Sequence, residues 1–139
     1  SGREDYVQGK QSFIRSVLRR ALSDMLLGKT VDIRIDRPLG SHHPKHTDMI
    51  YPVNYGYVPH IFSADGEEVD VYLLGVSQPV EKYKGRVIAV IHRLDDVEDK
   101  WIAAPTGVTF TPDEIEKAVN FQEQYFQHEI EMLDPNGDQ

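Results

Sequence analysis

Residues 51–70 read YPVNYGYVPHIFSADGEEVD and carry the features that decide the fold. Aromatic and β-branched residues predict a strand over 51–58, and a second strand is predicted over 69–75. Between them, four acids surround Gly66 at the point where the second strand should begin. The segment therefore predicts two neighbouring strands and an acidic turn.

This turn has two interpretations. Side chains alternate along an extended segment, so Asp65 and Glu67 point the same way, and a bend at Gly66 or Glu68 brings Asp70 toward them. Converging carboxylates repel one another unless a cation lies between them, and oxygen ligands favour Mg²⁺, Mn²⁺ or Ca²⁺. The alternative is a solvated turn, because Asp, Gly and Glu are ordinary loop residues.

The whole segment resembles the signature region of the soluble family I inorganic pyrophosphatases. Their tyrosine-rich strand is followed by Asp-x-Asp-Pro-x-Asp. Asp65 and Asp70 fall on the first and last acids of that motif, whereas Glu67 stands in for the middle aspartate and Glu68 for the proline. The resemblance implies that Asp65 and Asp70 bind metal and that Glu67 accepts a proton.

Two helices are predicted at the ends of the chain. Apolar residues at helical spacing predict an amphipathic helix over 13–26, stopped by Gly28 and packed on its own domain; a dimer seam or a membrane-surface helix is the alternative. Thr111, Pro112 and Glu114 form a capping box that starts a second helix. We expect that helix to run to Asp134.

The remaining pattern predicts short strands. Residues 30–36 alternate cleanly, and further strands are expected over 87–91 and 101–104. Such strands indicate a small barrel or sandwich. The fold class is therefore α+β but mainly β, and the resemblance specifies a distorted five-stranded antiparallel, OB-like barrel flanked by an N-terminal and a C-terminal helix.

Length and composition limit the classes of protein to which the chain can belong. The chain has 139 residues and is interpreted as a cloning remnant or disordered lead-in (1–9) followed by a single pyrophosphatase-like domain (10–139). A net charge of -8, from 15 basic and 23 acidic residues, argues against nucleic-acid binding. The apolar runs are too short to span a bilayer, and the lack of cysteine fits the cytoplasm.

A second acidic cluster follows the strand at 87–91. By itself, DDVEDK at 95–100 reads as a hairpin turn. In the family, two aspartates here complete the metal cage and a lysine contacts phosphate. The resemblance assigns Asp95 or Asp96 and Asp99 to metal and Lys100 to phosphate. The spacing is one residue tighter than in the family, so Glu98 is an alternative to Asp99.

Three further residues take roles from the resemblance. Asp36 ends the first strand where the family has a metal-facing glutamate. Tyr55 and Tyr125 match tyrosines near the family's active site. The family's lysine after the second tyrosine is Phe126 here, so one phosphate contact is absent.

The largest departure lies between Asp36 and Tyr51. The family has a hairpin there with a lysine, a glutamate and an arginine that hold phosphate, whereas this chain has a short loop, SHHPKH at 41–46. His43, Lys45 and His46 are expected to replace those cations. Arg93 is a further candidate for binding phosphate, ahead of Arg37 and Arg86.

The implied reaction is Mg²⁺-dependent hydrolysis of inorganic pyrophosphate to two phosphates, with Mn²⁺ as an alternative metal. Several metal ions would activate a water and bind the substrate. Self-association of the chain is expected from the family. Two alternatives stay open: a hydrolase with a shortened pocket for another phosphoanhydride or a phosphate ester, and a non-catalytic metal-binding module.

Overall fold

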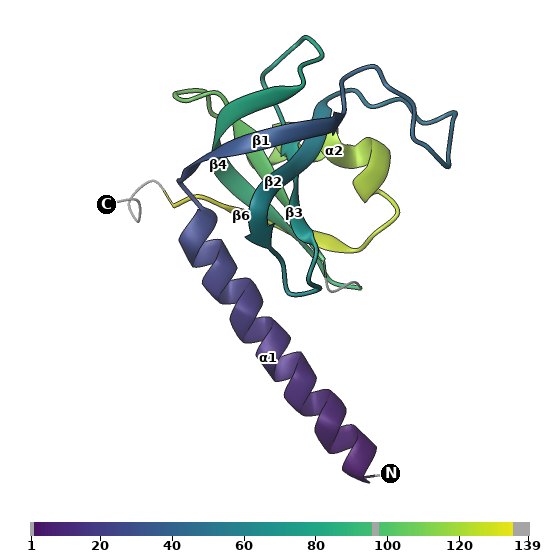
Figure 1. Cartoon of the computed structure of the whole chain (residues 1–139), viewed down its shortest axis with the longest axis vertical. Helices are drawn as coiled ribbons and strands as arrows, with labels where there is room; N and C mark the ends of the chain where they lie inside the picture. The colour runs from purple at the N-terminus through teal and green to yellow at the C-terminus, as the bar shows by residue number, and fades with distance from the viewer. Residues whose placement is uncertain (1, 96–97, 135–139) are drawn as a thin grey trace.

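The computed structural model describes residues 2–95 and 98–134, with the side chains of α1 described from Phe13 onward. Its elements form a barrel with one helix extending below it and a second on its side (Figure 1). In chain order they are α1 (Gly2–Leu26), β1 (Thr30–Arg37), β2 (Asn54–Phe62), β3 (Glu68–Leu73), β4 (Lys82–Arg93), β5 (Asp99–Ala104), α2 (Pro112–Glu123) and β6 (His128–Met132).

The five strands β1 to β5 close into a ring. They follow the order β1-β2-β3-β5-β4, and β4 pairs again with β1. The expected mainly β barrel with two flanking helices is confirmed, but β3 and β5 pair in parallel rather than antiparallel fashion. A ring with an odd number of strands cannot alternate direction all the way round, so one parallel pair is unavoidable.

Tight contact between β1 and β2 depends on Gly56. A Cβ atom at this position would lie 1.8 Å from the carbonyl oxygen of Arg34 on β1. Any larger residue would force the strands apart, so glycine is required where the tyrosine-rich segment crosses β1.

Side chains on the two faces of the strands enter different cores. Ile33, Val71 and Trp101 belong to one buried cluster, into which Leu26 at the end of α1 also packs. Tyr72 and Ile102, on the opposite face, pack with residues of α2. All six residues of β5 are buried, because both of its faces are covered. The second face, under α2, is the one that carries the pocket described below.

The helix α2 begins as predicted but ends early. The amide of Glu114 donates to the Thr111 hydroxyl at 3.1 Å and the Thr111 amide donates to the Glu114 carboxylate at 2.8 Å, which confirms the capping box. The prediction that the helix reaches Asp134 is wrong. It ends at Glu123, and β6 pairs with β4. The apolar residues of 126–133 fit both the helical and the strand period. They form a strand because the edge of β4 is open for pairing.

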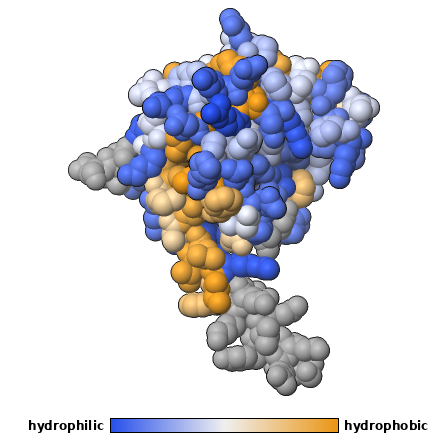
Figure 2. Space-filling view, viewed as in Figure 1, coloured by the Kyte–Doolittle hydropathy of each residue, from blue (hydrophilic) through white to orange (hydrophobic). Residues whose placement is uncertain are grey.

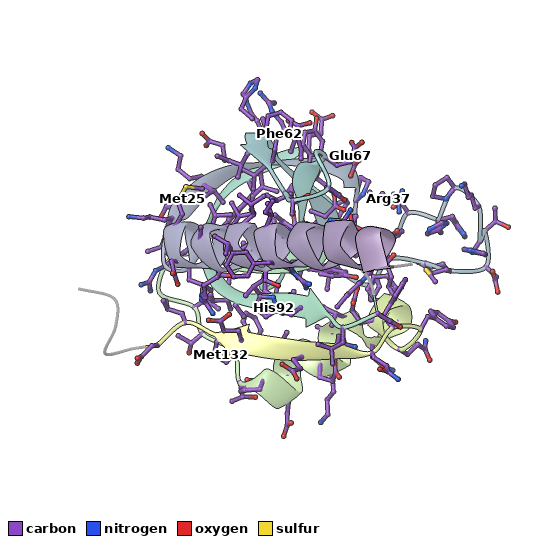
Figure 3. The ribbon with its side chains drawn as sticks, turned by 90° about the horizontal axis from the view of Figure 1, so that it is seen from below. Met25, Arg37, Phe62, Glu67, His92 and Met132 are labelled. Atoms are coloured by element: carbon purple, nitrogen blue, oxygen red, sulfur yellow. The ribbon has the colours of Figure 1, made fainter. Side chains whose placement is uncertain are left out.

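The first helix is confirmed, and its last turns pack on the barrel through Leu22 and Leu26, but the rest of its apolar stripe does not. It begins at Gly2, within the segment assigned to the lead-in, and the domain boundary stays a prediction. Five apolar side chains of α1 lie exposed rather than against the barrel: Phe13, Ile14, Val17, Leu18 and Met25. Figure 3 shows α1 crossing below the strands. Within the described residues, neither helix combines the length and apolarity needed to cross a bilayer.

Candidate active site

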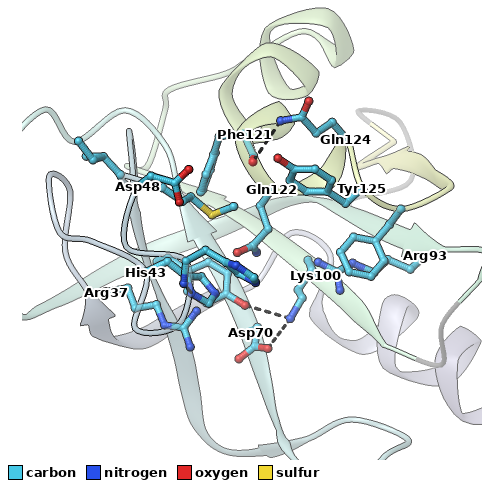
Figure 4. Close-up of a pocket in the computed structure, with 15 residues that line it drawn as sticks. Arg37, His43, Asp48, Asp70, Arg93, Lys100, Phe121, Gln122, Gln124 and Tyr125 are labelled. Atoms are coloured by element: carbon cyan, nitrogen blue, oxygen red, sulfur yellow. Dashed lines mark hydrogen bonds and ion pairs between the residues drawn. The ribbon is translucent and has the colours of Figure 1, made fainter.

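A pocket of about 830 Å³ opens on the face of the barrel next to α2 (Figure 4). Strands contribute its floor, the 38–53 loop one wall, and α2 with the residues after it the other. The lining consists of Arg37, His43, His46, Asp48, Met49, Ile50, Tyr55, Asp70, Arg93, Lys100, Phe121, Gln122, Gln124, Tyr125 and Phe126.

Lys100 is a buried charge in this pocket that contacts three oxygen-bearing side chains. Its ammonium donates to Asp70 at 2.6 Å, to the Tyr55 hydroxyl at 2.9 Å and to Glu98 at 3.0 Å. The parallel register places Asp70 of β3 directly beside Lys100 of β5. Glu98 lies two residues before Lys100 and therefore on the same side of the extended chain.

The electrostatics of this group favour a charged lysine between two acids. Burial lowers the pKa of Lys100, but the Tyr55 oxygen and the carboxylates of Asp70 and Glu98 outweigh it, so the pKa lies above its ordinary value. Burial raises the pKa of Glu98, and the hydrogen bond and charge of Asp70 add to that effect against the attraction of Lys100. Lys100 thus holds together two carboxylates that would otherwise repel each other.

A second cation, Arg37, comes from the end of β1. Its guanidinium donates to the Tyr51 hydroxyl at 2.6 Å and lies 5.7 Å from the ring centres of both Tyr51 and Tyr55. The neighbouring Asp36 does not line the pocket. Burial raises the pKa of Asp36, the charge of Asp70 adds to this effect, and Arg37 opposes it.

A third cation, Arg93, is engaged by a fully buried acid. Two of its nitrogens donate to Glu123 at 3.0 and 2.7 Å, and its guanidinium lies 3.6 Å from the ring centre of Phe126. Tyr72 donates to the same carboxylate at 2.6 Å. Burial raises the pKa of Glu123, but Arg93 and Tyr72 outweigh it, so the pKa of Glu123 lies below its ordinary value.

Hydrogen bonds connect the two arginines across the back of the pocket. Arg37 donates to Tyr51, Tyr51 donates to Gln122 at 3.2 Å, and Gln122 donates to Tyr72 at 2.6 Å. Tyr72 then reaches the Glu123 carboxylate that holds Arg93. This chain of contacts fixes the end of α2 against the strands and holds both guanidinium groups in place.

The short 41–46 loop reaches the pocket through two of its histidines. His43 and His46 line it, whereas Lys45 does not. The Nδ1 atom of His43 accepts from the amides of Lys45 at 3.0 Å and His46 at 3.1 Å. Desolvation and the nearby Arg37 lower the pKa of His43, which favours a neutral ring that carries its proton on Nε2.

Several acids expected in the site lie elsewhere. Asp65 accepts hydrogen bonds from the Ser63 hydroxyl and, at 3.0 Å, from the Glu67 amide, so it shapes its own turn. Both Asp65 and Glu67 are exposed and neither lines the pocket. Asp95 is also exposed, with the amide of Gln127 at 3.3 Å, and Asp96 falls outside the described residues.

Asp99 faces the first helix rather than the pocket. Its carboxylate pairs with Arg19 of α1 and lies 3.2 Å from Nδ1 of His92. Burial raises the pKa of Asp99, but His92 and Arg19 outweigh it, and the pKa lies below its ordinary value. Alternation along β5 turns Lys100 toward the pocket and Asp99 away from it. Glu98, not Asp99, is therefore the acid next to Asp70.

Oxygen donors for a hard cation are present, although not as a closed cage. Among the described side chains, those of residues 13–95 and 98–134, no three of His, Asp or Glu converge in a way that could hold a metal. Asp70 and Glu98 nevertheless meet at Lys100. A pair of carboxylates fits Mg²⁺, which commonly takes one or two of them together with the phosphates of a substrate.

Among the site residues that were not singled out from the sequence are four that form a hydrogen-bonded chain. Tyr51, Tyr72, Gln122 and Glu123 carry the hydrogen-bonded chain behind the pocket. Tyr51 lies in the tyrosine-rich signature and Gln122 just before Tyr125, so their positions offered a signal. Glu123 follows Ile115 and Val119 at a spacing of four residues, which places it on the buried side of α2 and distinguishes it from the exposed acids around it.

Fold and pocket together define a mainly β barrel protein with a charged cleft beside α2. The family model for inorganic pyrophosphatase matches residues 28–132. The chain belongs to the inorganic pyrophosphatase family, which confirms the resemblance drawn from residues 51–70.

Individual relatives agree with that membership. The inorganic pyrophosphatase of Caulobacter vibrioides is 31% identical over 97 residues, 59% of this chain and 55% of that protein. That of Saccharolobus solfataricus is 37% identical over 81 residues, 55% of this chain and 44% of that protein. The chain thus spans about half the length of these curated relatives.

Solved structures support the fold. The crystal structure of inorganic pyrophosphatase from Ehrlichia chaffeensis superposes with a TM-score of 0.60 at 20% identity and covers 77% of this chain and 88% of that one. The structure from Coxiella burnetii gives 0.58 at 16% identity, covering 81% and 89%. The barrel is therefore shared with inorganic pyrophosphatases of known structure.

Proposed function

We propose that this chain hydrolyses inorganic pyrophosphate to two phosphates in the pocket around Asp70 and Lys100. The observation that carries the proposal is the meeting of a buried ammonium with two carboxylates at the pocket wall, in a member of the inorganic pyrophosphatase family. Phosphoryl transfer needs both kinds of charge: cations against the phosphate oxygens and carboxylates to hold metal.

Two cations and one neutral histidine would bind the substrate. Lys100 keeps its charge and borders the same hollow as Arg37 (Figure 4). Arg37 is the group best placed to replace the family's missing hairpin, with His43 offering an Nε2–H donor. Arg93 lines the pocket but is held by Glu123, so we assign it a positioning role. Lys45 receives no role in binding, because it lies outside the lining.

Asp70 and Glu98 are the proposed ligands for Mg²⁺, with Mn²⁺ as the substitute. Glu98 takes the place of Asp99, whose carboxylate is engaged by Arg19 and His92. When bound, Mg²⁺ neutralises phosphate charge and lowers the pKa of a bound water. Metal binding by Asp36, Asp65, Asp95 and Asp96 stays a prediction from the resemblance.

The proton of the attacking water needs a carboxylate acceptor. The resemblance favours Glu67, which is exposed in its turn, whereas Glu98 contacts Lys100 and has a raised pKa that suits a general base. We favour Glu98. Substituting the true acceptor by glutamine should remove the acidic limb of the pH profile of kcat, so Glu67→Gln and Glu98→Gln distinguish the two.

A larger phosphoanhydride is the second candidate substrate. A pocket of about 830 Å³ is the size of sites that take drug-sized ligands, which leaves room beyond pyrophosphate. Phosphate release from pyrophosphate, triphosphate and a nucleoside triphosphate, with Mg²⁺ or Mn²⁺, tests both substrates. Preference for pyrophosphate supports the proposal, preference for either other compound supports the second candidate, and no release from any of them leaves the non-catalytic module.

A further inference from the structure

The amphipathic helix α1 meets the barrel through a mixed side, which carries Leu22 and Leu26 as well as polar residues. Arg19 pairs with Asp99 and donates to the carbonyl oxygen of Arg93 at 3.2 Å, and Arg20 reaches Glu131 at 2.7 Å. Ser23 and Leu26 are buried on the same side. A single amphipathic helix on a globular domain normally buries its whole apolar stripe, whereas α1 buries only the part nearest its end.

The apolar side is left open along most of the described helix. Phe13 is 70% exposed, and Ile14, Val17, Leu18 and Met25 are each about half exposed. At about 100° per residue, these side chains centre on the direction opposite to Ser23 and Leu26. Figure 2 shows them as a continuous hydrophobic band that runs down the helix away from the barrel.

We propose that this band binds a second copy of the chain, so that two α1 helices pair along it. The residues Ile14, Leu18, Ala21 and Met25 follow the spacing of four, three and four that forms the seam between two paired helices. Phe13 and Val17 flank the seam. The inference does not depend on the proposed activity, since it rests on the helix alone.

The available area suits a pair of copies. Five half-exposed large side chains present on the order of 500 Å² of apolar surface, and two such faces together would bury about 1,000 Å², where specific interfaces begin. A membrane surface suits the band less well. Arg19 and Arg20, two basic residues that would meet anionic lipids, are already paired with acids of the barrel.

Pairing would also support the pocket from behind. Arg19 binds Asp99 on one side of β5, while Lys100 and Glu98 face the ligand side. A partner that holds α1 in place would therefore hold the strand end that carries these two residues.

Sedimentation velocity of the full chain tests the pairing. We expect a dimer at micromolar concentration for the parent and for Asn120→Glu, which adds one charge at an exposed position of α2, and a monomer for Leu18→Glu. A monomeric parent would overturn the proposal, as would a dimer or larger oligomer that Leu18→Glu leaves intact. If a monomeric parent also co-sediments with phosphatidylserine vesicles, the band binds a membrane instead of a second copy.

Cysteine cross-linking covers the case in which Leu18→Glu fails to fold. The chain contains no cysteine, so a single one reports unambiguously. Separate Ile14→Cys, Leu18→Cys and Ala21→Cys variants sample the seam, and Asn120→Cys is the control. We expect a disulfide-linked dimer on mild oxidation from at least one seam position and none from the control. Equal cross-linking at all four positions, or at none, would contradict helix pairing.

Discussion

The ammonium of Lys100 lies 2.6 Å from the carboxylate of Asp70, on the neighbouring parallel strand. Lys100 is 4% exposed, so this ion pair lies largely out of solvent, and Glu98 at 3.0 Å completes it. One lysine therefore compensates two acids that the proposed metal would also use. The pocket carries its own cation at the place where the substrate and its metal are expected to bind.

Lys100→Met tests the role of that cation. The substitution keeps much of the side-chain volume but removes the charge proposed to bind the phosphates of the substrate. Loss of one such donor typically lowers kcat by about 10²- to 10³-fold. Steady-state phosphate release measures the effect, with Lys117→Met on the exposed side of α2 as the control. A kcat within twofold of the parent would remove Lys100 from the mechanism.

Arg37→Gln tests whether this residue replaces the missing hairpin. The variant loses the guanidinium that borders the pocket, and we expect KM for pyrophosphate to rise about tenfold, equivalent to roughly 1.4 kcal/mol. Arg34→Gln removes an arginine from the same strand outside the pocket and should leave KM unchanged. If both substitutions raise KM equally, Arg37 contributes only through the overall charge of the protein.

Glu123→Ala tests the buried network. The substitution leaves the buried Arg93 without its two short hydrogen bonds, and breaking such a pair from one side costs about 3–5 kcal/mol of unfolding free energy. Urea titration followed by the fluorescence of the single, fully buried Trp101 measures this loss. Glu129→Ala, at an exposed position of β6, should change stability by no more than about 0.5 kcal/mol.

The contacts of His92 predict that the free energy of unfolding depends on pH. The hydrogen bond to Asp99 raises its pKa, burial opposes this, and Glu131 at 2.8 Å adds to the rise. Because the folded pKa exceeds the unfolded value of about 6.5, the contribution is complete below pH 6.5 and is lost as the pH rises through the folded pKa. The stability advantage of the parent over His92→Gln should be larger at pH 6 than at pH 9. A constant or growing advantage would contradict this assignment.

Much of the barrel could be predicted from local patterns. Residues 30–36 alternate strictly and form β1, and the capping box at Thr111 starts α2 where expected. The end of α2 could not be predicted in this way. His128–Met132 fits both helical and strand periods, and only the open edge of β4 decides between them.

The site could be predicted less well from the sequence, because the three-dimensional fold decides which acids reach the pocket. Glu98 and Asp99 are adjacent in the chain, yet alternation along β5 sends the first toward Lys100 and the second toward Arg19. The direction of that alternation follows from the pairing of β5 with β3. Likewise, the apolar stripe of α1 was predicted correctly, but which side meets the barrel depends on the partners of Arg19 and Arg20.

Phosphate release from pyrophosphate with Mg²⁺, measured for the parent, Asp70→Asn and Asp32→Asn, tests the central claim most directly. Asp70 pairs with Lys100 in the pocket, whereas Asp32 is an exposed acid of β1 outside it. We predict turnover by the parent and by Asp32→Asn, and its loss in Asp70→Asn. Equal release by all three proteins, or none by the parent, would contradict hydrolysis at this site.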